Sequence, residues 1–370
     1  MKPRYTVYKS DISYFSGKLE AYLRYKGIAY EAIECGRDEL EEIAHATGVK
    51  KMPAVKMDNG QWLFDTTPML EWLEQQHPEP CTVPDDPALA FLALLIEDYG
   101  DEWLWRPAMW WRWVPRASRW AVGYAIGKAF APRLLARPLG WFFGRRQQRE
   151  WLWDDGVSRD NELVVRDMLF REFEFLEPLL IRQPFLLGSH PSSADFGYFA
   201  SMFRHFGNDP DPAEVMRQQA PNTYEWLARL WNTSADKLPE VIEWRWPKTP
   251  EWEPLLTRIA TDYLPYLHQN ALAFQRGHKR FDFTGHSLAF PGTKTTNYRA
   301  YCRERLQQQY QQLKGADHEK LEQLFRPVGG LGSLHKDGVI ASGLADTFIL
   351  PRQVQRRMPA FKLTRSQARN

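Results

Sequence analysis

The fold is decided by residues 51–73, which read KMPAVKMDNGQWLFDTTPMLEWL. Two short runs of strand-forming residues, Ala54–Met57 and Gln61–Phe64, flank an Asn59-Gly60 pair. An Asn-Gly pair between two such runs is the strongest short-range signal of a β-hairpin, because both residues tolerate the positive φ angles of the turn. This stretch therefore predicts two antiparallel strands joined by a tight turn.

A helix is expected directly after this hairpin. Thr66 or Thr67 suits the N-cap position, where a hydroxyl accepts a hydrogen bond from a free backbone N–H, and Pro68 suits the first turn. Three apolar residues that follow share one helical face, Met69, Leu70 and Leu73. We expect this face to pack against the sheet.

The residues before the hairpin alternate between strand and helix patterns. Tyr5–Tyr8 and Ala29–Glu34 read as strands. A helix that ends at Gly27 follows the first strand, and the charged, helix-prone stretch Asp38–His45 follows the second. The order strand, helix, strand, helix, strand, strand, helix is that of a thioredoxin-like α/β domain, which we place at residues 1–80.

Helical patterns dominate the remainder of the chain. After a linker at Pro78–Pro87, no convincing strand pairs occur until the last third. We therefore predict an all-α domain at residues 88–246, with an insertion near 116–149, and a mainly helical C-terminal extension at residues 247–370.

Composition limits the classes of function. Lys plus Arg number 48 and Asp plus Glu 46, so no overall charge marks the chain as a nucleic-acid-binding protein. The 3 cysteines lie far apart, without the spacing of metal sites or disulfide frameworks, which fits a reducing compartment. We find no signal-peptide pattern and no apolar run long enough to span a bilayer, so we expect a cytoplasmic protein.

Four motifs in this order resemble the glutathione transferase superfamily, and the resemblance covers roughly residues 4–232. They are Ser13–Lys18 with the helix that follows, Lys51–Val55, Phe64–Leu73, and the helix-start box Ser192–Phe196. The resemblance implies a thioredoxin-like glutathione-binding domain followed by an all-helical domain. It also implies a homodimer that uses glutathione as co-substrate.

The resemblance implies that Ser13 stabilises the thiolate of glutathione. A hydroxyl donor and a helix N-terminus both favour the charged form of a thiol, and so lower its pKa. Tyr8 is the rival donor, because some transferase classes use a tyrosine near the end of the first strand. The structural alternatives are that Ser13 only caps its helix and that Tyr8 is a strand aromatic packed on a helix.

The resemblance also implies contacts along the rest of the glutathione peptide. Asp65 and Thr66 are similar to the pair that holds the γ-glutamyl end, with the carboxylate meeting its ammonium group. A cis Pro53 would turn the backbone of Met52 toward the cysteinyl unit. Lys51 is a candidate for the glycyl carboxylate. Helix capping is the alternative role for Thr66, and a solvated surface position is the alternative for Lys51.

The second substrate is expected to be large and apolar. Trp103, Met109 and Trp110 fall on the helix that, in the family, walls the site for the electrophile. Tyr14, which stands where many relatives have proline, joins them as a substrate-binding candidate. For each tryptophan, packing in the helical core is the alternative.

The insertion is rich in basic and aromatic residues. Residues 116–149 contain eight arginines and lysines and no acidic residue. Such a segment suits a membrane surface or a cover over the active site, but we expect a solvated insertion packed on the helical domain. The histidines show no ligand spacing, so we assign no metal.

The sequence therefore predicts a glutathione transferase-like enzyme that activates the thiolate for attack on a hydrophobic electrophile. The alternative is a non-catalytic protein of the same fold that binds a ligand or a protein partner, with residues 247–370 supplying the interaction surface. A third hypothesis is a membrane-peripheral adaptor that uses the basic insertion.

Overall fold

The N-terminal domain is built on a four-stranded sheet. The computed structural model describes residues 4–352. The strands lie in the order β2-β1-β3-β4, and their bounds are β1 Tyr5–Lys9, β2 Tyr30–Glu34, β3 Ala54–Met57 and β4 Trp62–Phe64. β1 runs parallel to β2 and antiparallel to β3, and β3 pairs antiparallel with β4. The predicted hairpin is therefore present as β3 and β4.

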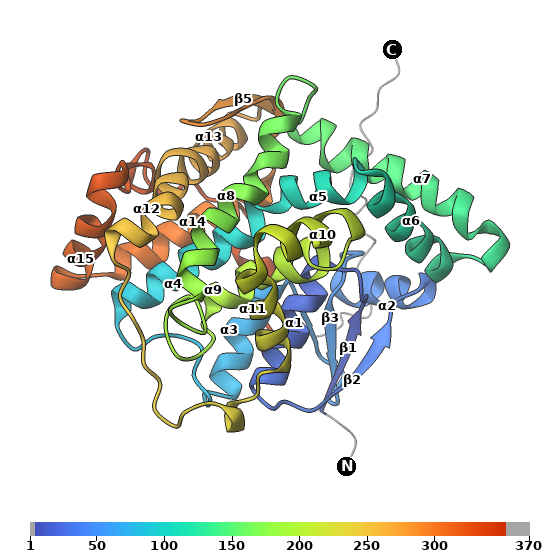
Figure 1. Ribbon diagram of the computed structural model, residues 1–370, viewed down its shortest axis with the longest axis horizontal. Helices are drawn as coiled ribbons and strands as arrows, with labels where there is room; N and C mark the ends of the chain where they lie inside the picture. Colours follow the sequence, from blue (N-terminus) through green and yellow to red (C-terminus); the bar gives the residue numbers. More distant parts are fainter. Residues whose placement is uncertain (1–3, 353–370) are drawn as a thin grey trace.

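Three helices cover the two faces of this sheet, with bounds α1 Tyr14–Tyr25, α2 Arg37–Thr47 and α3 Thr66–Gln76. α1 and α3 lie on the face turned toward the other helices of the molecule, and α2 lies on the opposite face (Figure 1). Successive residues of a strand point to opposite faces, so Val7 packs with α1 and α3 while Tyr8 packs with α2. The predicted thioredoxin-like fold is confirmed.

The start of α3 differs from the prediction that a threonine caps it. The helix begins at Thr66, so Asp65 stands at the N-cap position, and no side chain caps the helix there. The hydroxyl of Thr67 donates instead to Glu97 at 2.9 Å, and the carboxylate of Asp65 accepts a hydrogen bond from Tyr298. Contacts with distant parts of the chain therefore replace the local capping that the sequence favours.

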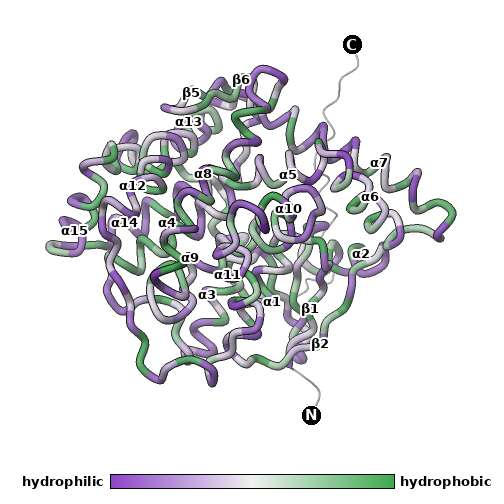
Figure 2. The backbone as a smooth tube through the Cα atoms, viewed as in Figure 1, coloured by the Kyte–Doolittle hydropathy of each residue, from purple (hydrophilic) through white to green (hydrophobic). Residues whose placement is uncertain are grey.

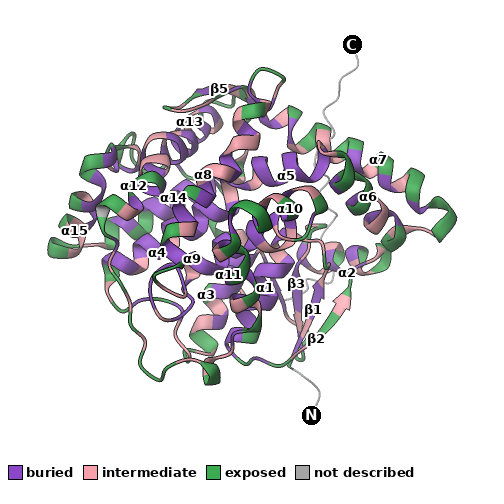
Figure 3. Ribbon diagram, viewed as in Figure 1, coloured by how far each residue is buried: buried purple, intermediate pink, exposed green. Residues whose placement is uncertain are grey.

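The second unit is helical. Its helices are α4 Pro87–Glu102, α5 Trp105–Trp113, α6 Arg116–Phe130, α7 Arg133–Trp151, α8 Glu162–Leu180, α9 Ser193–Ser201, α10 Pro210–Gln219 and α11 Pro221–Asn232. α4 and α9 lie at its centre and are buried along most of their length (Figure 3). They cross closely because Gly100 faces Gly197: a Cβ on Gly100 would lie 2.7 Å from the carbonyl carbon of Gly197.

The predicted helix-start box is present at the beginning of α9. Asp195 accepts hydrogen bonds from both the N–H and the hydroxyl of Ser192, each at 2.9 Å. Its second oxygen accepts a hydrogen bond from the N–H of Leu186 at 2.8 Å. Burial raises the pKa of Asp195 to about 6, although these hydrogen bonds act to lower it. The box therefore fixes the preceding loop as well as the start of the helix.

The C-terminal extension is mainly helical, as predicted, and contains one hairpin. Its elements are α12 Thr249–Arg258, α13 Leu264–Gln275, β5 Arg280–Thr284, β6 Ala289–Lys294, α14 Asn297–Gln312, α15 Gly315–Phe325 and α16 Gly332–His335. Its short 3-10 or π segments are η4 Ile259–Tyr263, η5 Arg326–Val328 and η6 Ala345–Phe348, and those of the helical domain are η1 Trp153–Asp155, η2 Met202–Phe206 and η3 Ala235–Lys237. Residues 353–370 of the predicted extension lie outside the described residues.

The extension returns to the N-terminal domain. α14 and α15 pack on α4, and η6 places Phe348 against Phe64 of β4 at a ring distance of 6.0 Å. The backbones of Trp62 and Arg352 exchange two hydrogen bonds, of 2.9 and 2.8 Å, at the edge of the sheet. The end of the extension therefore packs against β4, the edge strand that directly precedes α3 in the chain.

The insertion forms a helical hairpin made of α6 and α7. Its base is attached to the helical domain, where the N–H and the hydroxyl of Ser118 donate to Asp211 at 2.6 and 2.7 Å. At its far end Phe130 packs against the cluster that contains Tyr8 and Leu40, and the start of α7 lies at the outer edge of the molecule (Figure 1). Within residues 4–352, no helix is both long enough and apolar enough to cross a bilayer.

Candidate functional site

Ser13 stands directly before α1, at the end of the loop that follows β1. Its Oγ accepts a hydrogen bond from the N–H of Ser16 at 3.4 Å, and a hydroxyl that accepts one bond still carries a hydrogen to donate. The loop is held from the helical domain: Arg112 donates to the carbonyl of Ile12 at 2.8 Å and binds Asp209 at 2.7 and 2.9 Å. Ser13 therefore caps its helix and also offers a donor at a helix N-terminus.

Tyr8, the rival donor, lies on the other face of the sheet. Its hydroxyl donates to Glu42 of α2 at 2.9 Å, and its ring packs on Trp62 at 5.1 Å. Burial, followed by the charge and hydrogen bond of Glu42, raises the pKa of Tyr8. These contacts correspond to the packing role that the sequence analysis gave as the alternative. A thiol beside Ser13 would therefore lie on a different face from the Tyr8 hydroxyl.

Asp65 has an unusual backbone conformation at the start of α3. Its φ is 66°, in the left-handed region that residues with a side chain rarely adopt. The Tyr298 hydroxyl donates to its carboxylate at 3.1 Å. Burial raises the pKa of Asp65, while the hydrogen bond from Tyr298 and the charge of Lys51 act to lower it. A cationic group at this carboxylate would offset the cost of burying its charge.

The residues before β3 have the backbone that the sequence analysis predicted. The Met52–Pro53 peptide is cis. Pro53 is buried, Met52 is half-buried and Lys51 is exposed. The ammonium of Lys51 lies 5.8 Å from the centroid of the Tyr298 ring. Thr66, the first residue of α3, is buried. The structure thus places Lys51 and Asp65 on either side of a single tyrosine from the extension.

The four predicted substrate-binding residues are buried, as the alternative role in core packing requires. Tyr14 donates to the carbonyl of Gly100, and Met109 and Trp110 lie within the core of the helical domain. Trp103 is 1% exposed and packs edge-on against four aromatic rings of the extension, Tyr263, Tyr266, Phe283 and Phe290. The extension therefore covers Trp103, whereas the other three side chains are buried by other parts of the molecule.

One residue that the sequence analysis missed joins the site, Tyr298, and Glu102 lies near enough for the charges of the site to act on it. Burial raises the pKa of Glu102 to about 7, against the opposing charge of Arg299. The charges of Asp65 and Lys51 also act on Glu102. A carboxyl group that exchanges its proton near neutral pH is suited to acid–base work. No sequence motif marks either residue, because their surroundings are created by the packing of α14 on α4.

A buried ion cluster joins the two domains beside this site. The ammonium of Lys18 in α1 donates to Glu97 at 2.6 Å and to Asp101 at 2.5 Å, and it lies 3.4 Å from the hydroxyl of Thr67. All four side chains are buried. Moving the charged groups of such a cluster apart is energetically costly, because each buried charge would then have neither its partner nor water beside it. It therefore fixes α1 and α3 against α4.

The comparison with protein-family models concerns the N-terminal domain. Residues 7–81 match the family model described as glutathione S-transferase, N-terminal domain. A search of curated protein sequences found no match.

Several solved structures have a related fold at low identity. A glutathione S-transferase from Rhodospirillum rubrum F11 aligns over 68% of this chain and 92% of its own, with 17% identity and a TM-score of 0.43. One from Methylobacterium radiotolerans, in complex with glutathione sulfonate, aligns over 64% and 96%, with 18% identity and a TM-score of 0.42. The beta-etherase LigF from Sphingobium sp. strain SYK-6 aligns over 61% and 94%, with 20% identity and a TM-score of 0.44. At these values the likeness carries no argument about activity.

The family match coincides with the domain that contains Ser13, the cis Met52–Pro53 peptide and Asp65. Residues 7–81 of this chain therefore match the model of the glutathione S-transferase N-terminal domain.

Proposed function

We propose that the chain binds glutathione on its N-terminal domain and activates the thiol for transfer to a hydrophobic electrophile. The backbone of Asp65 is the observation that carries this proposal. A residue with a side chain held at positive φ costs about 1–3 kcal/mol, and such conformations cluster at ligand-binding sites. The match of residues 7–81 to the glutathione S-transferase N-terminal domain supports the same ligand.

Asp65 and Thr66 would hold the γ-glutamyl end of the peptide. The ammonium group would pair with the Asp65 carboxylate. Burial raises the pKa of this carboxyl group, so a cation beside it would stabilise its charged form. The α-carboxylate would meet the start of α3, where free N–H groups are available. The backbone of Met52 would pair with the cysteinyl unit and lead the thiol toward Ser13.

Ser13 would then stabilise the thiolate. Its hydroxyl hydrogen and the N-terminus of α1 both favour the charged form. A hydrogen bond to a charged group contributes about 1.5–3 kcal/mol and a helix N-terminus about 0.3–1 kcal/mol, while one pKa unit corresponds to about 1.4 kcal/mol. Together they lower the pKa of the thiol by about one to three units, which makes attack on an electrophile possible near neutral pH.

A second candidate function is ligand binding without turnover. It is favoured by the position of the extension, which brings Tyr298 to Asp65 and Phe348 to Phe64. A permanently covered thiol site would bind the peptide but exclude a large electrophile. The two candidates differ in turnover, not in glutathione binding.

The test is thermal unfolding with and without glutathione. Ligand binding stabilises the folded state, so glutathione should raise Tm of the wild type. Asp65→Asn removes the negative charge, while asparagine tolerates positive φ and so preserves the backbone. We expect this variant to lose most of the shift. Asp58→Asn, at an exposed position in the turn between β3 and β4, is the matched control and should keep the full shift.

Equal shifts in the wild type and Asp65→Asn would overturn the assignment of the γ-glutamyl site. Turnover of a generic aryl electrophile separates the two candidates: an enzyme turns it over, whereas a binding protein shows the Tm shift alone.

A further inference from the structure

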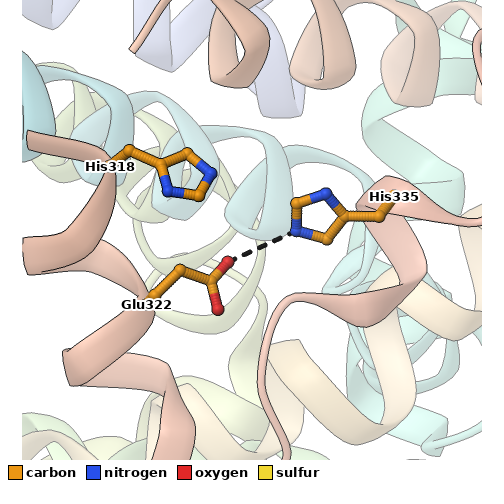
Figure 4. Close-up of side chains that lie close together, drawn as sticks. All are labelled: His318, Glu322 and His335. Atoms are coloured by element: carbon orange, nitrogen blue, oxygen red, sulfur yellow. Dashed lines mark hydrogen bonds and ion pairs between the residues drawn. The ribbon is translucent and has the colours of Figure 1, made fainter. Parts of the chain in front are cut away.

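We propose that the C-terminal extension contains a metal site formed by His318, Glu322 and His335. One potential ligand atom from each residue lies within 4.8 Å of the other two. Figure 4 shows the three side chains turned toward one another, two from α15 and one from α16. The site is separate from the proposed glutathione site and does not depend on it.

The ligand set fits a transition-metal ion, and zinc in particular. Two imidazoles and one carboxylate are a common zinc set, which leaves a fourth position for water. In a tetrahedral site with bonds of about 2.0–2.1 Å, neighbouring ligand atoms lie roughly 3.3 Å apart. The Nε2 atom of His335 and Oε1 of Glu322 are 3.3 Å apart. Small side-chain rotations would therefore bring the three ligands to bonding distance.

Tyr310 of α14 contacts all three residues of this cluster. Its hydroxyl donates to Oε1 of Glu322 and lies 3.2 Å from Nε2 of His335. Its ring packs on both imidazoles, with centroid distances of 4.9 Å to His318 and 5.0 Å to His335. Such contacts hold the three side chains in their orientations.

The spacing on α15 agrees with a shared site. His318 and Glu322 are four positions apart, so both side chains project from the same face of the helix. His335 lies in the short helix α16 and is half exposed, which leaves a path for an ion. A bound ion would therefore join α15 to α16 and brace the end of the extension.

The experiment is a zinc titration of the full chain after treatment with a chelator. Titration calorimetry with the zinc salt alone should show that one equivalent of zinc binds. Thermal unfolding should show a higher Tm with zinc than without it. His335→Ala changes an exposed side chain and should lower the affinity at least ten-fold. His278→Ala, at an exposed position after α13, is the matched control and should bind like the wild type. Cobalt added in place of zinc should give the visible bands of a tetrahedral site.

Absence of stoichiometric binding by the wild type would overturn the proposal. So would equal zinc affinity in the wild type and His335→Ala. His318→Gln tests whether a loss of binding in His335→Ala results only from a change in the fold of α16. Its substitution lies on α15 and should weaken zinc binding as well.

A second and independent observation concerns the hairpin of α6 and α7, for which we infer binding to an anionic lipid surface. Residues 116–149 of the hairpin contain eight basic side chains and no acidic one, and Glu150 near the end of α7 pairs with one of them, Arg146. The eight are Arg116, Arg119, Lys128, Arg133, Arg137, Arg145, Arg146 and Arg149. Leu134, in the first turn of α7, is 93% exposed. Four further large apolar side chains of the hairpin are more than half exposed, Trp120, Leu135, Trp141 and Phe142. Figure 2 shows this apolar character at the outer edge of the hairpin.

The two helices are pressed together through small residues, which turns the large side chains outward. A Cβ on Gly127 would lie 1.8 Å from the carbonyl oxygen of Ala136, and one on Gly140 would lie 1.8 Å from that of Gly123. Backbone contact of this kind leaves no space for side chains between the helices. The hairpin therefore presents its aromatic and basic side chains to the surroundings as one rigid unit.

A lipid surface matches this combination better than a soluble partner. Arginines interact with anionic headgroups, while tryptophan, leucine and phenylalanine enter the boundary between headgroups and acyl chains. Arg119, Arg137 and Arg145 surround a shallow groove together with Trp120 and Trp141, which suits a lipid phosphate. No helix of residues 4–352 has the character of a membrane span, so contact would be at the surface.

Vesicle sedimentation tests this inference on the full chain. The protein should pellet with vesicles that contain phosphatidylglycerol, bind at least ten-fold more weakly to pure phosphatidylcholine, and dissociate as salt screens the charges. The double variant Leu134→Ser and Leu135→Ser should also bind at least ten-fold more weakly. Val241→Ser, at an exposed apolar residue outside the hairpin, is the control and should bind like the wild type. Failure to pellet with anionic vesicles at low salt, or binding unchanged by the double variant, would contradict the inference.

Discussion

The hydroxyl of Tyr298 donates a hydrogen bond of 3.1 Å to the carboxylate of Asp65, across 233 positions of the sequence. This bond makes the C-terminal extension part of the proposed glutathione site. Burial raises the pKa of Asp65, and this hydrogen bond acts against that effect because it stabilises the charged carboxylate. The extension therefore influences the proposed ligand site through the Tyr298 hydroxyl and through the charge of Arg305.

Removing that hydroxyl should change the pH dependence of glutathione binding. Asp65 must be charged to hold the ammonium group, so binding weakens as the pH falls through the pKa of Asp65. Tyr298→Phe takes away a contact that lowers this pKa, so the loss should begin at a higher pH than in the wild type. The measurement is the Tm shift caused by glutathione across a pH series. Tyr301→Phe, one helical turn along α14, is the control, and an unchanged midpoint in Tyr298→Phe would contradict the assignment.

Ser13→Ala should raise the apparent pKa of bound glutathione and slow turnover. Loss of one charge-assisted hydrogen bond of about 1.5–3 kcal/mol corresponds to a fall of roughly ten- to a hundred-fold when thiolate formation limits the rate. Ser13→Thr retains the hydroxyl and should keep most of the activity. Tyr8→Phe should have little effect, because the Tyr8 hydroxyl is bound to Glu42. A spectroscopic titration of the thiolate checks all three variants.

The ligand-free stability of Ser13→Ala is needed as a control, since losing an N-cap costs about 0.5–2 kcal/mol. A shifted thiol pKa in Tyr8→Phe together with an unchanged one in Ser13→Ala would transfer the donor role to the tyrosine.

Glu102→Gln should flatten the dependence of stability on pH. The pKa of Glu102 is raised from 4.5 to about 7 in the folded state, so the folded protein holds its proton more strongly than the unfolded chain. The stabilisation is thus complete below about 4.5 and is lost as the pH rises to about 7. Urea unfolding at several pH values measures this. Glu31→Gln, at an exposed position of β2, should keep the wild-type slope, and the same slope in Glu102→Gln would count against the raised pKa.

Lys18→Met should destabilise the protein by about 3–5 kcal/mol, because it leaves Glu97 and Asp101 buried without their cation. Carboxylates without that cation bind protons more strongly in the folded state, so part of the loss should recover as the pH falls. Urea unfolding at about pH 8 and about pH 5 measures both effects. Lys50→Met removes an exposed ion pair with Glu41 and should leave stability nearly unchanged. A similar small effect in Lys18→Met would show that the cluster is unimportant.

Several local elements of the fold could be predicted from the sequence alone. The Asn59-Gly60 turn, the apolar face of α3 and the box of Ser192 and Asp195 each depend on residues a few positions apart. Interactions at such short range are encoded by residue type and spacing, so they can be recognised without knowledge of the rest of the chain. The residues of the proposed glutathione site could be named from the sequence because Ser13, Pro53 and Asp65 lie in such motifs.

Tertiary structure alone decided what surrounds those motifs. It turned Tyr8 toward Glu42, buried Trp103 under the extension and brought Tyr298 to Asp65. It also gathered His318 and His335 from two helices. The partners of each side chain come from segments far away in the sequence, and only the packing of complete helices determines which segments meet. The spacing of residues in the sequence does not show which distant segments come into contact, because this depends on how the chain between those segments folds.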